Sequence, residues 1–180
     1  LDGACRIPEL ISKVVKDGMK GIAITDHGNM FGVKIFHEEA RKHEGFKPII
    51  GCETYVARRS RRDRSEIIDR KGDHLILLAR NYEGYRNLVK LISYSWIEGH
   101  YYKPRIDKEL LRRYHGGLIA SSACLAGEIP RAIQAGNPDK AEASIREFQE
   151  IFGDDFYLEV MRHQASDPQR DSSVYQRQVM

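Results

Sequence analysis

Strand-like apolar runs alternate repeatedly with amphipathic helical patterns along this chain, and this alternation limits its possible folds more than any other feature. The expected strands are residues 21–25, 47–56, 75–79, 117–120 and 156–161. The expected helices are residues 8–17, 30–43, 81–95, 109–114 and 138–152. Such alternation is typical of an α/β fold with parallel strands, as an open doubly wound sheet or most of a barrel.

Composition narrows the class of protein further. A chain of 180 residues with 41% hydrophobic and 31% charged residues forms one domain, or a piece of one, of ordinary globular type. Its apolar runs are too short to span a membrane. The three cysteines are widely spaced and form no CxxC, which excludes a zinc ribbon and a disulfide framework and favours the cytoplasm. Glycine-rich dinucleotide and P-loop motifs are absent, so neither kind of nucleotide site is supported.

Basic residues are concentrated between Arg58 and Lys71, where seven basic residues accompany three acids. Such a run can attract phosphates, but it is more often a solvated surface. No aromatic residue is interleaved for base stacking. We therefore predict a mobile loop that contributes at most non-specific attraction to phosphate.

Polar side chains with metal-binding chemistry occur at the junctions of several expected strands. The apolar run 21–24 ends in Thr25-Asp26-His27-Gly28-Asn29, and Glu53, His74 and Cys124 occupy comparable junctions. Together they indicate a dispersed metal site. Taken singly, Cys124 could be a buried small hydrophobe, His74 part of a surface pair and Glu53 part of a salt bridge. His74 precedes its expected strand, so that strand either runs antiparallel or begins earlier than its apolar pattern.

Several segments resemble, in order, the motifs of the polymerase and histidinol phosphatase (PHP) domain at the amino terminus of the bacterial DNA polymerase III alpha subunit. These segments are residues 25–32, 47–56, 83–88, 101–107 and 122–130. The resemblance covers nearly the whole chain, and Tyr101-Tyr102-Lys103-Pro104-Arg105-Ile106-Asp107 is typical of the polymerase branch of the family.

The resemblance implies a distorted (β/α)7 barrel with metal ligands at one mouth. Asp2, His27, Glu53, His74 and Cys124 match ligand positions, of which His27, Glu53 and His74 would also serve catalysis. Asp26 would lie behind the site and orient an imidazole. The family's first His-x-His and last Asp-x-His motifs are missing, so residues 1–180 are expected to be a single PHP domain fragment, truncated at both ends.

The family also implies a function and its cofactors. Up to three zinc or manganese ions in the complete domain would support phosphodiester hydrolysis, as in a 3′–5′ proofreading exonuclease of a replicative polymerase. One alternative is a non-catalytic scaffold of the polymerase, and another is a stand-alone histidinol-phosphatase-like phosphoesterase, which the 101–107 segment disfavours. The expected partners are DNA, reached through the full polymerase, and other replisome subunits, without a membrane. The fragment alone is expected to be inactive.

Overall fold

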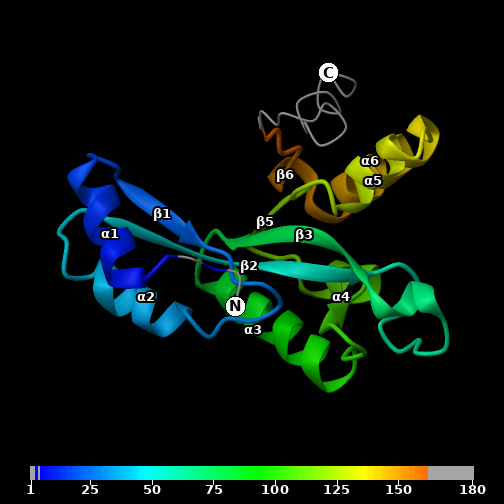
Figure 1. Ribbon diagram of the computed structural model, residues 1–180, viewed down its shortest axis with the longest axis horizontal. Coiled ribbons are helices and arrows are strands. Elements are labelled where there is room, and N and C mark those ends of the chain that lie inside the picture. The colour runs from blue at the N-terminus through cyan, green and yellow to red at the C-terminus, as the bar shows by residue number, and fades with distance from the viewer. Residues whose placement is uncertain (1–2, 4, 162–180) are drawn as a thin grey trace.

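A mixed sheet forms the centre of the molecule, with helices packed against it (Figure 1). The structure is a computed structural model that describes residue 3 and residues 5–161. The strands are β1 (Gly21–Ile24), β2 (Lys47–Ala57), β3 (Gly72–Ala79), β4 (Arg105–Ile106), β5 (Leu118–Ser121) and β6 (Phe156–Tyr157). The helices are α1 (Ile7–Lys16), α2 (Val33–Ala40), α3 (Tyr82–Ile97), α4 (Lys108–Tyr114), α5 (Glu128–Gln134) and α6 (Pro138–Phe152). Two 3₁₀ turns are η1 (Ile67–Arg70) and η2 (Gly153–Asp155).

The strands are not all parallel, which corrects the expected sheet. They lie in the order β1-β2-β3-β5-β6, with β4 paired to β2. Both neighbours of β3 run antiparallel to it, whereas β1–β2, β2–β4 and β5–β6 are parallel. The reason is the link between β2 and β3, which contains only η1. Antiparallel neighbours need no crossover helix. The result is an α/β fold with a mixed sheet, consistent with part of a PHP barrel.

Two elements escaped the sequence pattern because they are short. α5 spans seven residues and carries Pro130 in its first turn, where the missing N–H is tolerated. β4 has only two residues. Conversely, the strand expected at 156–161 ends at Tyr157, and the helix expected at 30–43 forms only over Val33–Ala40. The other expected helices and strands are present with small shifts of their ends.

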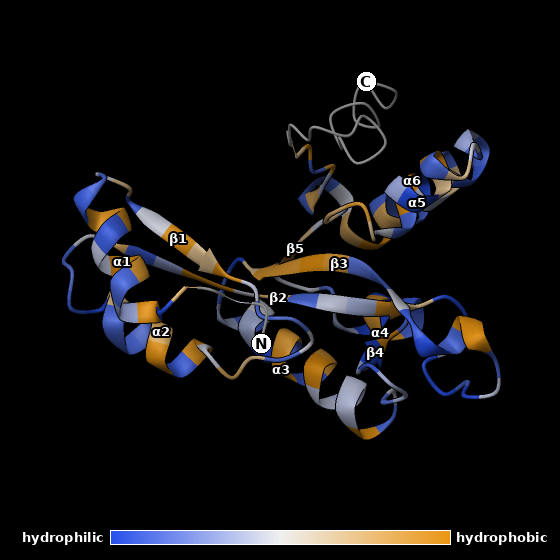
Figure 2. Cartoon of the chain, in the orientation of Figure 1, coloured by the Kyte–Doolittle hydropathy of each residue, from blue (hydrophilic) through white to orange (hydrophobic). Residues whose placement is uncertain are grey.

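The main hydrophobic core lies between the sheet and the helices α3 to α6. Leu75 and Leu77 of β3 pack with Leu88 and Leu91 of α3 and with Phe148 of α6, and all five are almost fully buried. Figure 2 shows the run of apolar residues along β3. A second, smaller cluster joins Ile11 of α1 to Phe36 and Ala40 of α2. Because β2 and β3 are largely buried, the ends of these strands are held in place, and polar side chains project from those ends.

The arginine segment, residues 58–71, exposes most of its side chains but is anchored by buried ion pairs, so the prediction of an unanchored, mobile loop is wrong. The side chain of Arg61 is only 3% exposed and forms ion pairs with Asp107 at 2.9 Å, Glu98 at 2.8 Å and Glu109 at 3.1 Å. Asp69 is buried and pairs with Arg59 at 2.6 Å. Composition could not reveal these ion pairs, because two partners of Arg61 are distant in the sequence. Asp107 immediately precedes α4, and Glu109 lies within that helix.

Arg105 of β4 also anchors the arginine segment. It is completely buried, and its guanidinium donates hydrogen bonds to the backbone carbonyls of Asp69 at 2.5 Å, Arg61 at 2.9 Å, Asp63 at 3.0 Å and Gly99 at 3.1 Å. Burial lowers the pKa of Arg105 below its ordinary value. Because a buried cation is costly without such partners, these bonds explain how a charged segment can close over β4.

Among the described residues, the helices are all too short or too polar to cross a membrane.

Candidate metal centre

Glu53 and His74 come from neighbouring antiparallel strands and share one face of the sheet. The register pairs Tyr55 of β2 with His74 of β3. Since side chains two residues apart on a strand point the same way, Glu53 and Tyr55 both lie on the face of His74. This arrangement resolves the difficulty with His74. β3 runs antiparallel to β2 and begins at Gly72, so the start of β3 lies beside the end of β2.

Four potential ligands converge at this place. Nδ1 of His74 lies 3.1 Å from Oε1 of Glu53, and Sγ of Cys124 lies 3.4 Å from the same nitrogen. His27 directs its Nδ1 at the second oxygen of Glu53, Oε2. Ligand atoms of Glu53, His74 and Cys124 all lie within 4.8 Å of one another. We call Glu53, His74, Cys124 and His27 the metal cluster.

The loop after β1 fixes the position of His27. Its backbone continues the parallel pairing of β1 with β2, since the Gly28 N–H donates to the Glu53 carbonyl at 2.8 Å and the Glu53 N–H to the Asp26 carbonyl at 3.1 Å. Gly28 has a φ of +66°, and a Cβ there would lie 2.9 Å from the ring of Tyr55. Only glycine therefore allows the chain to turn so close to the sheet.

A tight turn after β5 presents Cys124. Ala123 has a φ of +58°, a left-handed conformation that is uncommon for a residue with a side chain. The Gly127 N–H donates to the Cys124 carbonyl at 2.9 Å, and the His74 N–H donates to the Ala126 carbonyl at 3.1 Å. The turn is thus tied to the first residues of β3, which keeps the thiol beside the imidazole of His74.

Glu53 is the electrostatic centre of the cluster. Burial raises its pKa, but the hydrogen bond from His74 and the charges of His74 and His27 act against burial, and the net result is a pKa below the usual 4.5. Its ion pairs with described residues are with these two histidines. Glu53 is therefore an ionised carboxylate held between two imidazoles, a group prepared to accept a cation.

Two other predicted residues have different outcomes. The carboxylate of Asp26 accepts a hydrogen bond from the Gly32 N–H at 3.0 Å, at the start of α2, so its described contact secures that helix. A role for Asp26 in orienting an imidazole stays a prediction. Asp2 lies outside the described residues.

The donor set suits a transition metal, and zinc in particular. Zinc accepts thiolate, imidazole and carboxylate ligands, usually four in number. Cys52, by contrast, is fully buried, and burial raises the pKa of its thiol to about 12, so it behaves as a core residue. The free thiol of Cys124 is half-buried and lies among the other donors.

Two residues near the cluster escaped the sequence analysis. The ring of Tyr55 meets that of His74 edge to face at 5.2 Å, and the ammonium of Lys103 lies over the Tyr55 ring at 5.3 Å. The alternation of β2 contained the signal for Tyr55, because it is two residues from Glu53. The position of Lys103 depends on β4 and was not readable from a local pattern.

Comparison with known proteins agrees with this geometry. The family model of the PHP domain matches residues 1–163. The chain is 50% identical over 168 residues to the DNA polymerase III subunit alpha of Borreliella burgdorferi. The aligned region covers 93% of this chain and 15% of that protein. The corresponding protein of Treponema pallidum is 48% identical over 165 residues, covering 91% of this chain and 14% of that protein. The chain spans about a seventh of the length of these curated relatives. The chain belongs to the PHP domain family.

Proposed function

We propose that this chain is the metal-binding PHP module of a bacterial replicative DNA polymerase and that residues 1–180 form one fragment of that domain. The observation that carries the proposal is the convergence of Glu53, His74, Cys124 and His27 from four separate segments. Relatives named DNA polymerase III subunit alpha support the polymerase context. Asp2 is proposed as a fifth ligand, and zinc or manganese as the metal, with up to three ions in the complete domain.

The proposed activity is hydrolysis of a phosphodiester at the 3′ end of DNA, as in proofreading. Bound metal ions would supply a nucleophilic hydroxide near neutral pH and neutralise charge on the phosphate. The residues of the chain would hold that centre: Glu53 as a carboxylate ligand, His27 and His74 as imidazole ligands, and Cys124 as a thiolate. Lys103 supports a phosphate substrate, because it holds a positive charge one aromatic ring away from His74.

A non-catalytic scaffold is the second candidate, and one observation favours it. Each carboxylate oxygen of Glu53 faces a histidine, so the cluster can join the loop after β1 to β2 and β3 without turning over a substrate. A stand-alone histidinol-phosphatase-like enzyme has less support, because the relatives described above are polymerase subunits. DNA and other replisome subunits are the proposed partners, through the complete polypeptide.

The deciding experiment uses the complete polypeptide and a primer–template with a mismatched 3′ nucleotide. With zinc or manganese present and nucleotides absent, we expect release of the terminal nucleotide. Glu53→Gln should abolish that release while primer extension continues. Cys5→Ser is the matched control, because Cys5 is an exposed thiol outside the cluster. Absence of nucleotide release, with or without bound metal, would favour the scaffold instead, and release that survives Glu53→Gln would contradict the metal cluster as the site of hydrolysis.

A further inference from the structure

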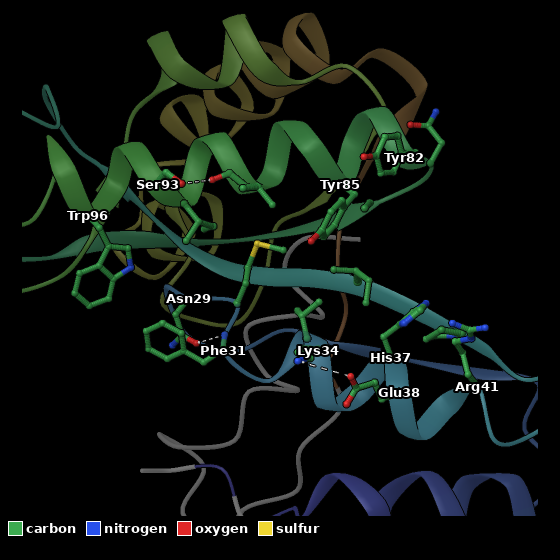
Figure 3. A pocket seen from close by; sticks show the side chains of 18 of the residues that line it. Asn29, Phe31, Lys34, His37, Glu38, Arg41, Tyr82, Tyr85, Ser93 and Trp96 are labelled. Carbon is green, nitrogen blue, oxygen red and sulfur yellow. Dashed lines mark hydrogen bonds and ion pairs between the residues drawn. The ribbon is translucent and has the colours of Figure 1, made fainter.

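A long apolar groove separates α2 from α3 and has no role in the metal centre. Its volume is about 1200 Å³. In Figure 3, Lys34, His37, Glu38 and Arg41 of α2 face Tyr82, Tyr85, Ser93 and Trp96 of α3 across it. Its lining also includes apolar side chains of the two helices and of the strands and loops that connect them: Met30, Val33, Pro48, Ile50, Ala79 and Ile92.

The topology of the sheet explains why this groove is open. In a regular α/β layer, each strand is followed by a helix that crosses the face of the sheet. Here only the 3₁₀ turn η1 lies between β2 and the antiparallel strand β3, so no α-helix occurs in the sequence between α2 and α3. Pro48 and Ile50 of β2 consequently line the gap and are only partly buried. A helix is the element that this position lacks.

The rim of the groove exposes large apolar side chains. Phe31 is 81% exposed, Ile97 77% and Tyr82 74%, and Trp96 and Val89 are also exposed. Single exposed apolar residues are unremarkable, but a contiguous set around a groove marks an interaction site. Trp96 is anchored by its Nε1–H, which donates to the Gly28 carbonyl at 2.9 Å, so the wall that it forms is preorganised.

Charge is distributed unequally between the two walls. The α2 wall carries Lys34, His37 and Arg41, with Glu38 as its acid, whereas the lining residues of α3 are uncharged. Lys34 and Glu38 are 3.9 Å apart and both strongly exposed, so this pairing is weak. An occupant that matches this groove has apolar residues on one face and acidic residues along the flank that meets α2. An amphipathic helix presents both at i, i+3, i+4 and i+7 spacing.

We propose that the groove between α2 and α3 binds an amphipathic helix of a partner protein, with its apolar face on Ile50 and Val89 and an acidic flank along Lys34 and Arg41. A second copy of this chain fits poorly, because two α2 walls would bring like charges together. Single-stranded nucleic acid fits less well despite the aromatic rings of α3, because the cations lie on one wall only and Pro48, Ile50 and Ile92 make the rest of the lining aliphatic. The inference does not depend on the proposed metal chemistry.

The chain contains its own probe, since Trp96 is its single tryptophan and lines the groove. The test titrates the full 180-residue chain with a synthetic helical peptide bearing leucines at i, i+3, i+4 and i+7 and glutamates on one flank. We expect a saturable shift in Trp96 emission. A peptide with lysines in place of the glutamates should bind at least about tenfold more weakly. Equal binding of the two peptides, or no binding by a folded chain, would overturn the proposal.

Variants locate the site and control for net charge. Lys34→Glu combined with Arg41→Glu should reverse the preference and favour the lysine peptide. The matched control combines Lys16→Glu and Arg86→Glu, which remove the same charge from exposed helix positions outside the groove lining and should leave the preference unchanged. Ser93→Arg should block both peptides without disturbing the core, since Ser93 is exposed. An oligothymidylate that displaces the glutamate peptide would assign the groove to nucleic acid and overturn the proposal.

Discussion

The metal cluster and the arginine segment both adjoin strands β2 and β3, but their charged side chains have different kinds of partner. Asp73 and His74 are adjacent on β3, so their side chains point to opposite faces. Asp73 pairs with Arg58 at 3.0 Å and with Arg131 at 3.3 Å. His74 instead meets Glu53. At the start of β3, one face is thus tied by ion pairs, and the other presents potential metal ligands.

This difference separates structural from functional charge. In and around the arginine segment, cations meet carboxylates or backbone carbonyls within the chain, as Arg61 of the segment and Arg105 of β4 show. In the metal cluster, one carboxylate, two imidazoles and a thiol converge, and a cation from outside is the partner that would complete them. Removing a charge should therefore unfold the first region, whereas removing a donor from the second should cost metal.

The largest expected effect is at Arg105, the residue of β4 that anchors the arginine segment. Arg105→Met should lower the free energy of unfolding by about 3–5 kcal/mol, because several buried carbonyls lose their donor. Urea denaturation followed by circular dichroism measures this change. Arg112→Met is the control, since Arg112 is an exposed residue of α4 paired with Glu147, and it should cost less than about 1 kcal/mol. Equal small losses in both variants would show that the segment is held by something other than Arg105.

The next effect concerns the metal cluster. Cys124→Ser should leave the stability of the metal-free chain nearly unchanged and abolish the stabilisation by zinc, which is about 2.7 kcal/mol at a hundredfold excess of free zinc over the dissociation constant. Melting curves with and without zinc measure both quantities. Cys5→Ser should retain the full stabilisation. If Cys124→Ser instead destabilises the metal-free chain strongly, the cysteine is a packing residue, and the contrast between the two regions fails.

A smaller effect distinguishes the regions by pH. The hydrogen bonds from Arg59 lower the pKa of Asp69 from 3.8 to about 2, although burial opposes this. A carboxyl with a depressed pKa adds stability that is fully present above its unfolded pKa and is lost as the pH falls through the folded pKa. The stability difference between the wild type and Asp69→Asn should therefore be constant above about pH 4 and shrink towards pH 2. Asp154→Asn, at an exposed position, should show no such window, and a constant difference down to pH 2 would contradict the pairing.

Local periodicity was sufficient for most of the fold. α1, α3 and α6 combine apolar spacing with proline or asparagine at their starts, so their sequence and structure agree closely. The direction of β3 was not predictable in this way, because parallel and antiparallel strands have the same alternation. It depends on whether residues 58–71 form a crossover helix, and their anchoring comes from distant partners, Glu98, Arg105 and Asp107.

The cluster shows the same limit. Glu53, His27 and Cys124 were recognisable as polar residues at strand junctions, and the family resemblance supplied their order. Sequence could not show that Glu53 lies between two imidazoles, or that Tyr55 meets His74 with Lys103 over the Tyr55 ring, because these contacts arise from strand register and from β4. The sequence and the family resemblance named candidate donors, and tertiary structure determined which groups they contact.

X-ray absorption at the zinc edge tests the central claim most directly, because it identifies the atoms bound to the metal. The complete polypeptide, loaded with zinc, should show a sulfur ligand at about 2.3 Å together with nitrogen or oxygen ligands at about 2.0–2.2 Å. Cys124→Ser should lose the sulfur signal, and Cys5→Ser should keep it. A zinc site without sulfur in the wild type, or a sulfur signal that survives Cys124→Ser, would contradict the assignment of Glu53, His74, Cys124 and His27 as one metal centre.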